Sequence, residues 1–292
     1  MLGGALKVCL ETYAPHVQVI TTDKSENKNC VPAAANFKIS HIFHCAASVD
    51  ADFCESNPGH ARSTILEYTK NIVKLARKNK CKIFYPQSFL IYDGKTNPID
   101  EKTSPNPISI YGKFKLEAEK FLVENYEDSL IVRMGGFFGG EEKDKNFVGK
   151  FVKILKGAIS NNIKEIVVGD RRWQPTYTKD LAYNCLLLLA YQKNGIYSMA
   201  SEDDASFFSV AEECVMQLKL ANKIKVIQDD FDIIKKKDIA LRPDRVVLSN
   251  SKLKAEKLYA IRNWKDALSE YLNSKYFEKY FEANSSKVVN VA

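Results

Sequence analysis

Hydrophobic and polar residues follow two rhythms along the chain, one typical of buried strands and one typical of amphipathic helices. Short apolar runs predict four strands in the first half, at residues 17–21, 41–45, 82–85 and 130–133. Apolar residues that recur every three or four positions predict helices over residues 58–79 and 111–125. Because strands separated by helices pair in parallel through right-handed crossovers, the pattern predicts an α/β fold with a parallel sheet.

The alternation continues after a glycine-rich turn at residues 135–140. Strands are predicted at 165–168 and 196–199, and helices at 147–159, 178–191, 209–220 and 263–281. Residues 285–292 lack periodicity, so we expect a frayed tail. No internal repeat interrupts this order.

Composition and charge narrow the class of protein. The chain has 292 residues, of which 45% are hydrophobic and 27% charged, enough for one large domain or a domain with a smaller lobe. The net charge of +7 is spread along the whole chain, so we expect no nucleic-acid partner, whereas a small anionic substrate such as a nucleotide diphosphate suits a mild positive balance.

Cysteine usage and hydropathy indicate the compartment. The seven cysteines form an odd set without a CxxC pair, which predicts reduced thiols and a cytoplasmic protein. No apolar stretch approaches the roughly 18 residues of a membrane span, so we expect no membrane partner. The four histidines lack the spacing of metal ligands, so no metal site is expected.

The segment with the clearest chemistry is Tyr111-Gly-Lys-Phe-Lys115, which follows Ser88 by 23 positions. A tyrosine and a lysine four residues apart lie on one face of a helix, where the ammonium can stabilise the ionised phenol and lower its pKa. The spacing alone also fits an exposed helix face. Both interpretations, an exposed face and a proton-donating site with Ser88, stay open on the spacing alone.

Five separated segments, in order, resemble the extended short-chain dehydrogenase/reductase family and, within it, the dTDP-4-dehydrorhamnose reductase type. They are His44-Cys-Ala-Ala-Ser-Val-Asp-Ala-Asp52 with Glu55-Ser-Asn-Pro58, Gln87-Ser-Phe-Leu-Ile-Tyr-Asp-Gly94, Pro107-Ile-Ser-Ile-Tyr111-Gly-Lys-Phe-Lys115, Pro175-Thr-Tyr-Thr-Lys-Asp-Leu-Ala182 and Leu241-Arg-Pro243. The resemblance spans nearly the whole chain. It implies a Rossmann-like doubly wound sheet with a smaller C-terminal substrate-binding lobe.

The resemblance also implies domain boundaries. We expect residues 1–135, with parts of 160–200, to form the dinucleotide-binding domain. Residues 136–160 and 201–284 would then form the substrate lobe.

The resemblance implies a catalytic set and a reaction. Ser88, Tyr111 and Lys115 would be catalytic in the reduction of a 4-keto sugar attached to a nucleotide, with NAD or NADP as cofactor. Tyr111 would donate the proton, Lys115 would lower the pKa of Tyr111 and hold the nicotinamide ribose, and Ser88 would bond the carbonyl oxygen. Phe89 and Gly136 would join Ser88 and Tyr111 at the substrate.

Further residues are expected at the cofactor. Cys45, Ala46 and Ala47 have small side chains that let the backbone approach a dinucleotide, beside Tyr111 and Lys115. Gly3 matches the third glycine of a G-x-x-G-x-x-G loop, so the first strand and the first two glycines are missing from the pattern. Asp23 would bind the adenosine ribose of NAD, while the neighbouring Lys24 suits the 2′-phosphate of NADP, so both cofactors stay open.

Several positions depart from the family and keep other functions open. Phe89 replaces an acidic residue, and Gly136 stands where the rhamnose reductases carry a tryptophan that packs on the substrate. A non-catalytic relative, such as the regulatory beta subunit of methionine adenosyltransferase, is one alternative, with a partner enzyme in place of a substrate. A nucleotide-sugar epimerase or dehydratase is another, and a homodimer is also open.

Overall fold

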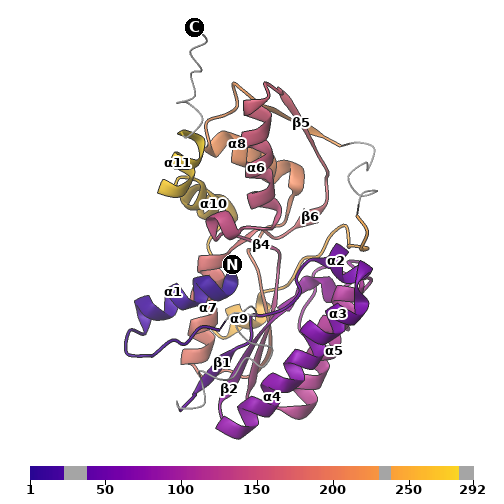
Figure 1. Cartoon of the computed structure of the whole chain (residues 1–292), viewed down its shortest axis with the longest axis vertical. Helices are drawn as coiled ribbons and strands as arrows, with labels where there is room; N and C mark the ends of the chain where they lie inside the picture. The colour runs from indigo at the N-terminus through magenta and orange to yellow at the C-terminus, as the bar shows by residue number, and fades with distance from the viewer. Residues whose placement is uncertain (23–37, 230–237, 283–292) are drawn as a thin grey trace.

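The computed structural model describes residues 1–22, 38–229 and 238–282, which form a lobe built on a sheet and a second lobe above it (Figure 1). The helices and strands in chain order are α1 (Leu2–Tyr13), β1 (His41–Phe43), α2 (Ala51–Ser56), α3 (Pro58–Arg62), the π-helical turn η2 (Ser63–Glu67), α4 (Tyr68–Asn79), β2 (Lys82–Ser88), the 3-10 turn η3 (Phe89–Ile91), α5 (Ile110–Asn125), β3 (Ser129–Met134), β4 (Phe137–Phe138), the 3-10 turn η4 (Glu141–Lys143), α6 (Phe147–Ser160), β5 (Glu165–Val168), β6 (Arg172–Trp173), β7 (Thr176–Tyr177), α7 (Thr178–Ala190), β8 (Gly195–Met199), β9 (Ala205–Ser206), α8 (Phe207–Gln217), β10 (Lys225–Gln228), α9 (Ser251–Ala255), α10 (Trp264–Leu272) and α11 (Lys275–Glu282).

The main sheet is parallel, as the alternating pattern predicts. Its four strands lie in the order β1-β2-β3-β8. The register aligns Ser88 with Met134, and Met134 with Met199, so that β2, β3 and β8 end level at one edge. Residues that follow these strands therefore meet at the carboxyl edge of the sheet.

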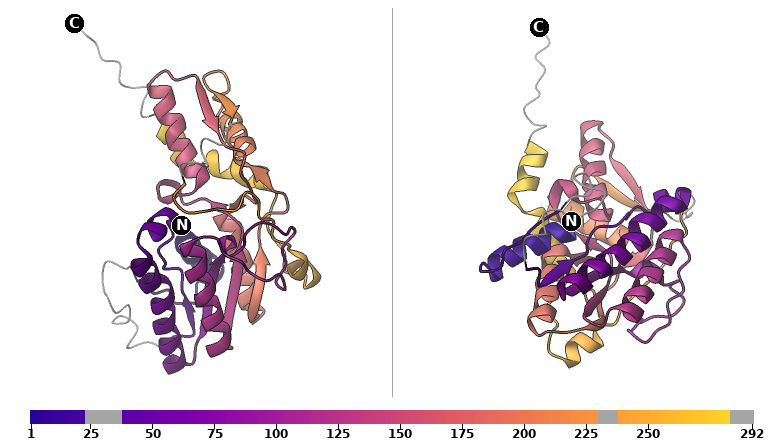
Figure 2. Two further views of the ribbon diagram at one scale, coloured as in Figure 1. Left: turned by 90° about the vertical axis from the view of Figure 1, so that its right-hand side faces the viewer. Right: turned by 60° about the horizontal axis from the view of Figure 1, so that its bottom comes forward.

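Both faces of the sheet are covered, which confirms the doubly wound arrangement (Figure 2). Phe84 on β2 and Val132 on β3 pack on one face with apolar residues of α1, α7 and the segment around α9. Ile83 and Ile131, their neighbours along the strands, pack on the other face with residues of α2 to α5. A strand that is buried on both faces reads as a continuous apolar run, which is why the sequence shows it clearly.

Two expectations for the first half of the chain need correction. Residues 17–21 form no strand, because Val17 and Ile20 are 42% and 40% exposed and the described residues offer these positions no strand partner. The helix expected over 58–79 is one helical run, but residues 63–67 widen into a π-helical turn between α3 and α4.

Strand β1 lies at one edge of the main sheet, where the dinucleotide-binding pattern leads one to expect a further strand. Among the described residues, β1 is hydrogen-bonded to β2 on one side and is not paired with residues 17–21 on the other. Gly3, expected to end a glycine loop, lies in the first turn of α1. Asp23 and Lys24 lie outside the described residues.

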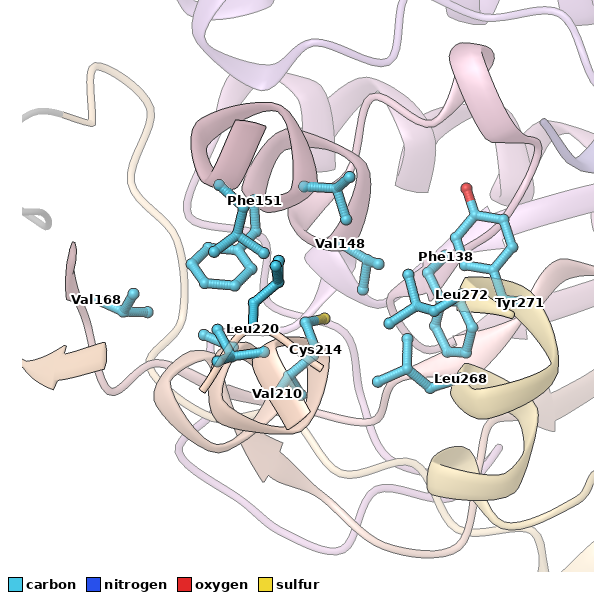
Figure 3. Close-up of a cluster of buried hydrophobic side chains, with 14 of the residues drawn as sticks. Phe138, Val148, Phe151, Val168, Val210, Cys214, Leu220, Leu268, Tyr271 and Leu272 are labelled. Atoms are coloured by element: carbon cyan, nitrogen blue, oxygen red, sulfur yellow. The ribbon is translucent and has the colours of Figure 1, made fainter. Parts of the chain in front are cut away.

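The second lobe has its own core, shown in Figure 3, where Phe138, Phe151 and Val210 come together from β4, α6 and α8. Strand β5 lies at the predicted position but pairs with β10 rather than with the main sheet. The helix expected over 263–281 is divided into α10 and α11. The side-chain amide of Asn273 donates to the Ser269 carbonyl (2.9 Å) where α10 ends.

Within the part of the chain that the structure describes, every helix is too short or too polar to span a bilayer.

Candidate functional site

Ser88 ends β2 at the carboxyl edge of the main sheet. Its Oγ accepts a hydrogen bond from the Leu90 amide (3.2 Å), which caps the 3-10 turn that follows. Because this bond uses a lone pair, the hydroxyl proton is left to donate. The Ser88 hydroxyl is also near enough to the Tyr111 phenol to act on its pKa.

Tyr111 lies in the first turn of α5, and three features hold that turn in place. Ser109 caps the helix by accepting a hydrogen bond from Gly112 N (3.2 Å), and the Glu55 carboxylate accepts one from Ile110 N (2.9 Å). A Cβ atom on Gly112 would stand 2.2 Å from the Leu90 carbonyl oxygen. Only glycine therefore allows α5 to approach the turn after Ser88 this closely.

Lys115 follows Tyr111 by one helical turn and is 4% exposed. Its Nζ donates to the Pro86 carbonyl (2.7 Å) and lies 3.9 Å from the centre of the Tyr85 ring. Burial lowers the pKa of Lys115 to about 7, against the opposing effects of Glu119 and Cys45. At neutral pH, Lys115 is therefore near the midpoint of its titration, with the ammonium and the neutral amine both present.

The expectation of a lowered pKa at Tyr111 is wrong for this structure. Burial raises the pKa of Tyr111 to about 12, although the neighbouring Ser88 hydroxyl opposes the rise. The physical reason is the loss of water around the buried phenol, which the Lys115 ammonium, bonded to the Pro86 carbonyl and over the Tyr85 ring, does not offset. The phenol is therefore held as a proton donor.

The residues expected at the cofactor gather beside this group. A Cβ atom on Gly3 would lie 3.4 Å from Cys45 Cβ, so the first turn of α1 touches the end of β1. Burial raises the pKa of the Cys45 thiol to about 12, while Lys115 and the amino terminus oppose the rise. Cys45, Ala46 and Ala47 are only partly buried.

This arrangement fits the nicotinamide half of a dinucleotide. The small residues after β1 leave backbone accessible at the carboxyl edge of the sheet, and the amino end of α1 next to them suits an anion. Ser88 ends the next strand, β2, and Tyr111 and Lys115 lie in the first two turns of α5, which follows it. Among the described residues, no cluster of histidine, cysteine and carboxylate side chains suits a metal ion.

Two residues were expected at the substrate, Phe89 and Gly136. Phe89 is partly buried in the turn after Ser88. Gly136 faces the side chain of Trp173, a contact that the sequence does not predict. A Cβ atom on Gly136 would stand 2.2 Å from Cε3 of Trp173, so the indole covers this glycine. Trp173 also packs edge to face on Phe147 and Phe207. The chain thus has a tryptophan from β6 where the resemblance leads one to expect it two residues after β3.

Comparison with known proteins gives a family match over most of the chain. A family model described as the RmlD substrate binding domain matches residues 4–277. A dTDP-4-keto-6-deoxy-D-glucose reductase from Streptomyces niveus is 26% identical over 279 residues, which are 92% of each chain.

A second kind of relative matches part of the chain. Methionine adenosyltransferase 2 subunit beta from Xenopus tropicalis is 34% identical over 171 residues, which are 56% of this chain. The match spans 50% of that relative's length.

Solved structures agree with the family match. A dTDP-4-dehydrorhamnose reductase from Clostridium acetobutylicum has a TM-score of 0.83 at 27% identity, covering 93% of this chain and 95% of that one. A dTDP-4-dehydrorhamnose reductase from Bacillus anthracis, solved in complex with NADP, has a TM-score of 0.82 at 21% identity, covering 93% and 94%.

Proposed function

Since the chain belongs to the RmlD substrate-binding-domain family, we propose that it reduces the 4-keto group of a nucleotide-linked sugar, with NADH or NADPH as the reductant. The observation that carries the proposal is the placement of Ser88 at the end of β2 close to Tyr111 in the first turn of α5, with Lys115 one helical turn further on. The likeness to reductases over more than nine-tenths of the chain supports the substrate class.

Three side chains divide the work on the ketone. Ser88 donates a hydrogen bond to the carbonyl oxygen, and Tyr111 donates its proton to that oxygen as negative charge develops there. A pKa of about 12 keeps Tyr111 protonated at neutral pH, so the donor is ready before the reaction. Lys115, in its ammonium form, stabilises the phenolate that remains.

Residues at the end of β1 would hold the cofactor, which supplies the hydride. Cys45, Ala46 and Ala47 are only partly buried, and the first turn of α1 lies against Cys45 at Gly3. The choice between NADH and NADPH is made at the adenosine end, where Asp23 and Lys24 are the candidate residues.

Replacing Tyr111 with phenylalanine tests the proposal. We expect Tyr111→Phe to reduce kcat by about a hundredfold or more, because general acid catalysis is worth at least that factor. Oxidation of NADPH with a dTDP-4-keto-6-deoxy sugar gives kcat, and nucleotide fluorescence gives the cofactor Kd, which should stay unchanged. Tyr191→Phe is the control, since Tyr191 is 64% exposed. Turnover of Tyr111→Phe at the wild-type rate would disprove the role of Tyr111.

A second candidate function is that of a regulatory subunit for a methionine adenosyltransferase. The 34% identity to a beta subunit favours it. Size-exclusion chromatography with a catalytic methionine adenosyltransferase subunit distinguishes the two functions. A stable complex without consumption of NAD(P)H selects the regulatory subunit, and conversion of the sugar without net oxidation of cofactor selects an epimerase or dehydratase.

A further inference from the structure

A buried polar network lies directly behind the candidate catalytic residues. Gln87, Glu119 and Arg133 are 3%, 3% and 4% exposed, and they come from β2, α5 and β3. Polar groups this deep are costly unless each finds partners. Their partners include the backbone of Ser88 and of Lys115.

The Gln87 side chain bridges the strand of Ser88 and the helix of Lys115. Its Oε1 accepts the Ser88 amide hydrogen (2.8 Å). Its Nε2 donates to the Lys115 carbonyl (2.9 Å) and to Oε2 of Glu119 (3.0 Å). One amide therefore fixes the backbone of both residues.

Glu119 is held in a bidentate ion pair. Arg133 Nε donates to Oε2 of Glu119 (3.2 Å), and Nη2 donates to Oε1. The remaining guanidinium nitrogen donates to the Tyr92 hydroxyl (2.7 Å) and the Glu101 carbonyl (3.2 Å). Because both carboxylate oxygens of Glu119 accept hydrogen bonds, the carboxylate is held in one position beside α5.

That place is one turn beyond Lys115, since Tyr111, Lys115 and Glu119 succeed one another at intervals of four residues. The titratable groups that face Lys115 are Glu119 and Tyr111 on α5, Tyr85 on β2 and Cys45 after β1. At neutral pH the phenols and the thiol are uncharged, because burial raises the pKa of all three. The carboxylate among these four is Glu119, which is ion-paired with Arg133 of β3.

We propose that Glu119 and Gln87 are positioning residues for the reaction: Gln87 aligns Ser88 with the turn of α5 that carries Lys115, and Glu119, held by Arg133, anchors the Gln87 amide and places a carboxylate one turn beyond Lys115. This inference rests on the proposed function for its catalytic meaning. The charge effect on Lys115 itself is a property of the folded chain and can be measured without substrate or cofactor.

The direction of the effect follows from the charges. Burial lowers the pKa of Lys115 to about 7, and Glu119 is the largest influence that raises it. Loss of the carboxylate should therefore lower the pKa further. At neutral pH most of Lys115 would then be a neutral amine, which cannot stabilise the phenolate of Tyr111.

The test is the titration of Lys115 in the full chain, followed by NMR of ¹³Cε-labelled lysine, with the resonance assigned by Lys115→Arg. We expect Glu119→Gln to move the titration to lower pH by about one unit, the size of effect that a nearby opposite charge produces. Glu124→Gln is the control, because Glu124 is exposed near the end of the same helix. It should leave the titration unchanged.

A second variant guards against loss of folding, because Glu119→Gln leaves the buried Arg133 charge unpaired. Glu119→Gln with Arg133→Met removes both charges and should still lower the pKa of Lys115. If Lys115 titrates as in the wild type in both variants, the role of Glu119 is disproved.

Gln87→Met separates alignment from charge. We expect it to leave the titration of Lys115 in place and to reduce kcat by roughly tenfold or more, in keeping with the loss that misplacement of reacting groups causes. An unchanged kcat would disprove the role of Gln87. A shifted titration in Glu119→Gln, in a wild-type chain that reduces no sugar, would support the charge effect and reject the proposed function.

Discussion

Trp173 and Gly136 show how one residue without a side chain sets the place of a large one. The indole lies where a Cβ atom of residue 136 would be, and it is almost fully buried against Phe147 and Phe207. The two residues are 37 positions apart, and their contact brings the second lobe over the end of β3.

We expect Gly136→Ala to lower the free energy of unfolding by about 1–3 kcal/mol, the usual cost of overpacking a core. The added methyl group would stand 2.2 Å from the Trp173 ring, and the ring is held by two other aromatic side chains. Urea unfolding followed by circular dichroism gives the value.

Gly157→Ala is the matched control, since nothing lies within 4 Å of its Cβ position on α6. There, alanine should raise stability by about 0.5–1 kcal/mol through helix propensity. Equal effects of the two substitutions would contradict the assigned contact.

Helix α5 is the element that decides whether the site exists, because it carries both Tyr111 and Lys115. Its amino end is held by Ser109 and by Glu55, a residue of α2 that lies 55 positions earlier than Ile110. A carboxylate at this end also interacts favourably with the positive end of the helix dipole. The Glu-x-x-Pro segment of the sequence thus has a structural function in addition to any role near the cofactor.

Removal of the Glu55 carboxylate should loosen this end of α5. We expect Glu55→Ala to cost about 1 kcal/mol of stability, as the loss of a helix cap does. Turnover should fall as well, because Tyr111 lies in the released turn. Glu55→Gln, which keeps an acceptor oxygen, should recover most of the stability in the same urea unfolding series. A stability of Glu55→Ala equal to that of the wild type would show that Ser109 alone is sufficient.

At the scale of the whole molecule, the segment that leads into α9 is fastened to α2. Arg242 forms a two-pronged ion pair with Asp52 (2.8 and 2.9 Å), and Asp52 also accepts the amides of Ala240 (2.9 Å) and Ile239 (3.2 Å). Arg242 contacts Asp238 as well (3.0 Å). The Arg-Pro pair of the sequence therefore joins distant parts of the chain.

This fastening predicts a pH dependence of stability. The hydrogen bonds from Arg242 hold the pKa of Asp52 at about 2, below its usual value, so the unfolded chain binds the proton more readily. The contribution of Asp52 should be complete above about pH 5 and should disappear as the pH falls towards 2.

Comparison of Asp52→Asn with the wild type at several pH values checks this expectation. The variant should be less stable by about 1 kcal/mol at pH 7, a modest figure because the pair is partly exposed to solvent, and equally stable near pH 2. Asp170→Asn, at an exposed position, should show no such trend. A constant difference between Asp52→Asn and the wild type over the whole range would rule out the ion pair as the cause.

Much of the fold and the core of the site were predictable because the signals are local. A strand buried on both faces is a run of apolar residues, and Tyr111 and Lys115 share a helix face through their spacing alone. Residues 17–21 show the limit of such signals. An apolar run becomes a strand only beside a partner, and the run itself does not contain the partner.

The amino-acid sequence by itself determined the parallel sheet, the covering helices and the order of Ser88, Tyr111 and Lys115 along them. The tertiary structure decided where the lysine points, which indole covers Gly136, and how Gln87, Glu119 and Arg133 meet behind the site. Each of these depends on contacts between elements far apart in the chain, several of them with backbone atoms that every residue possesses. The spacing of residues within one helix or strand does not reveal such contacts.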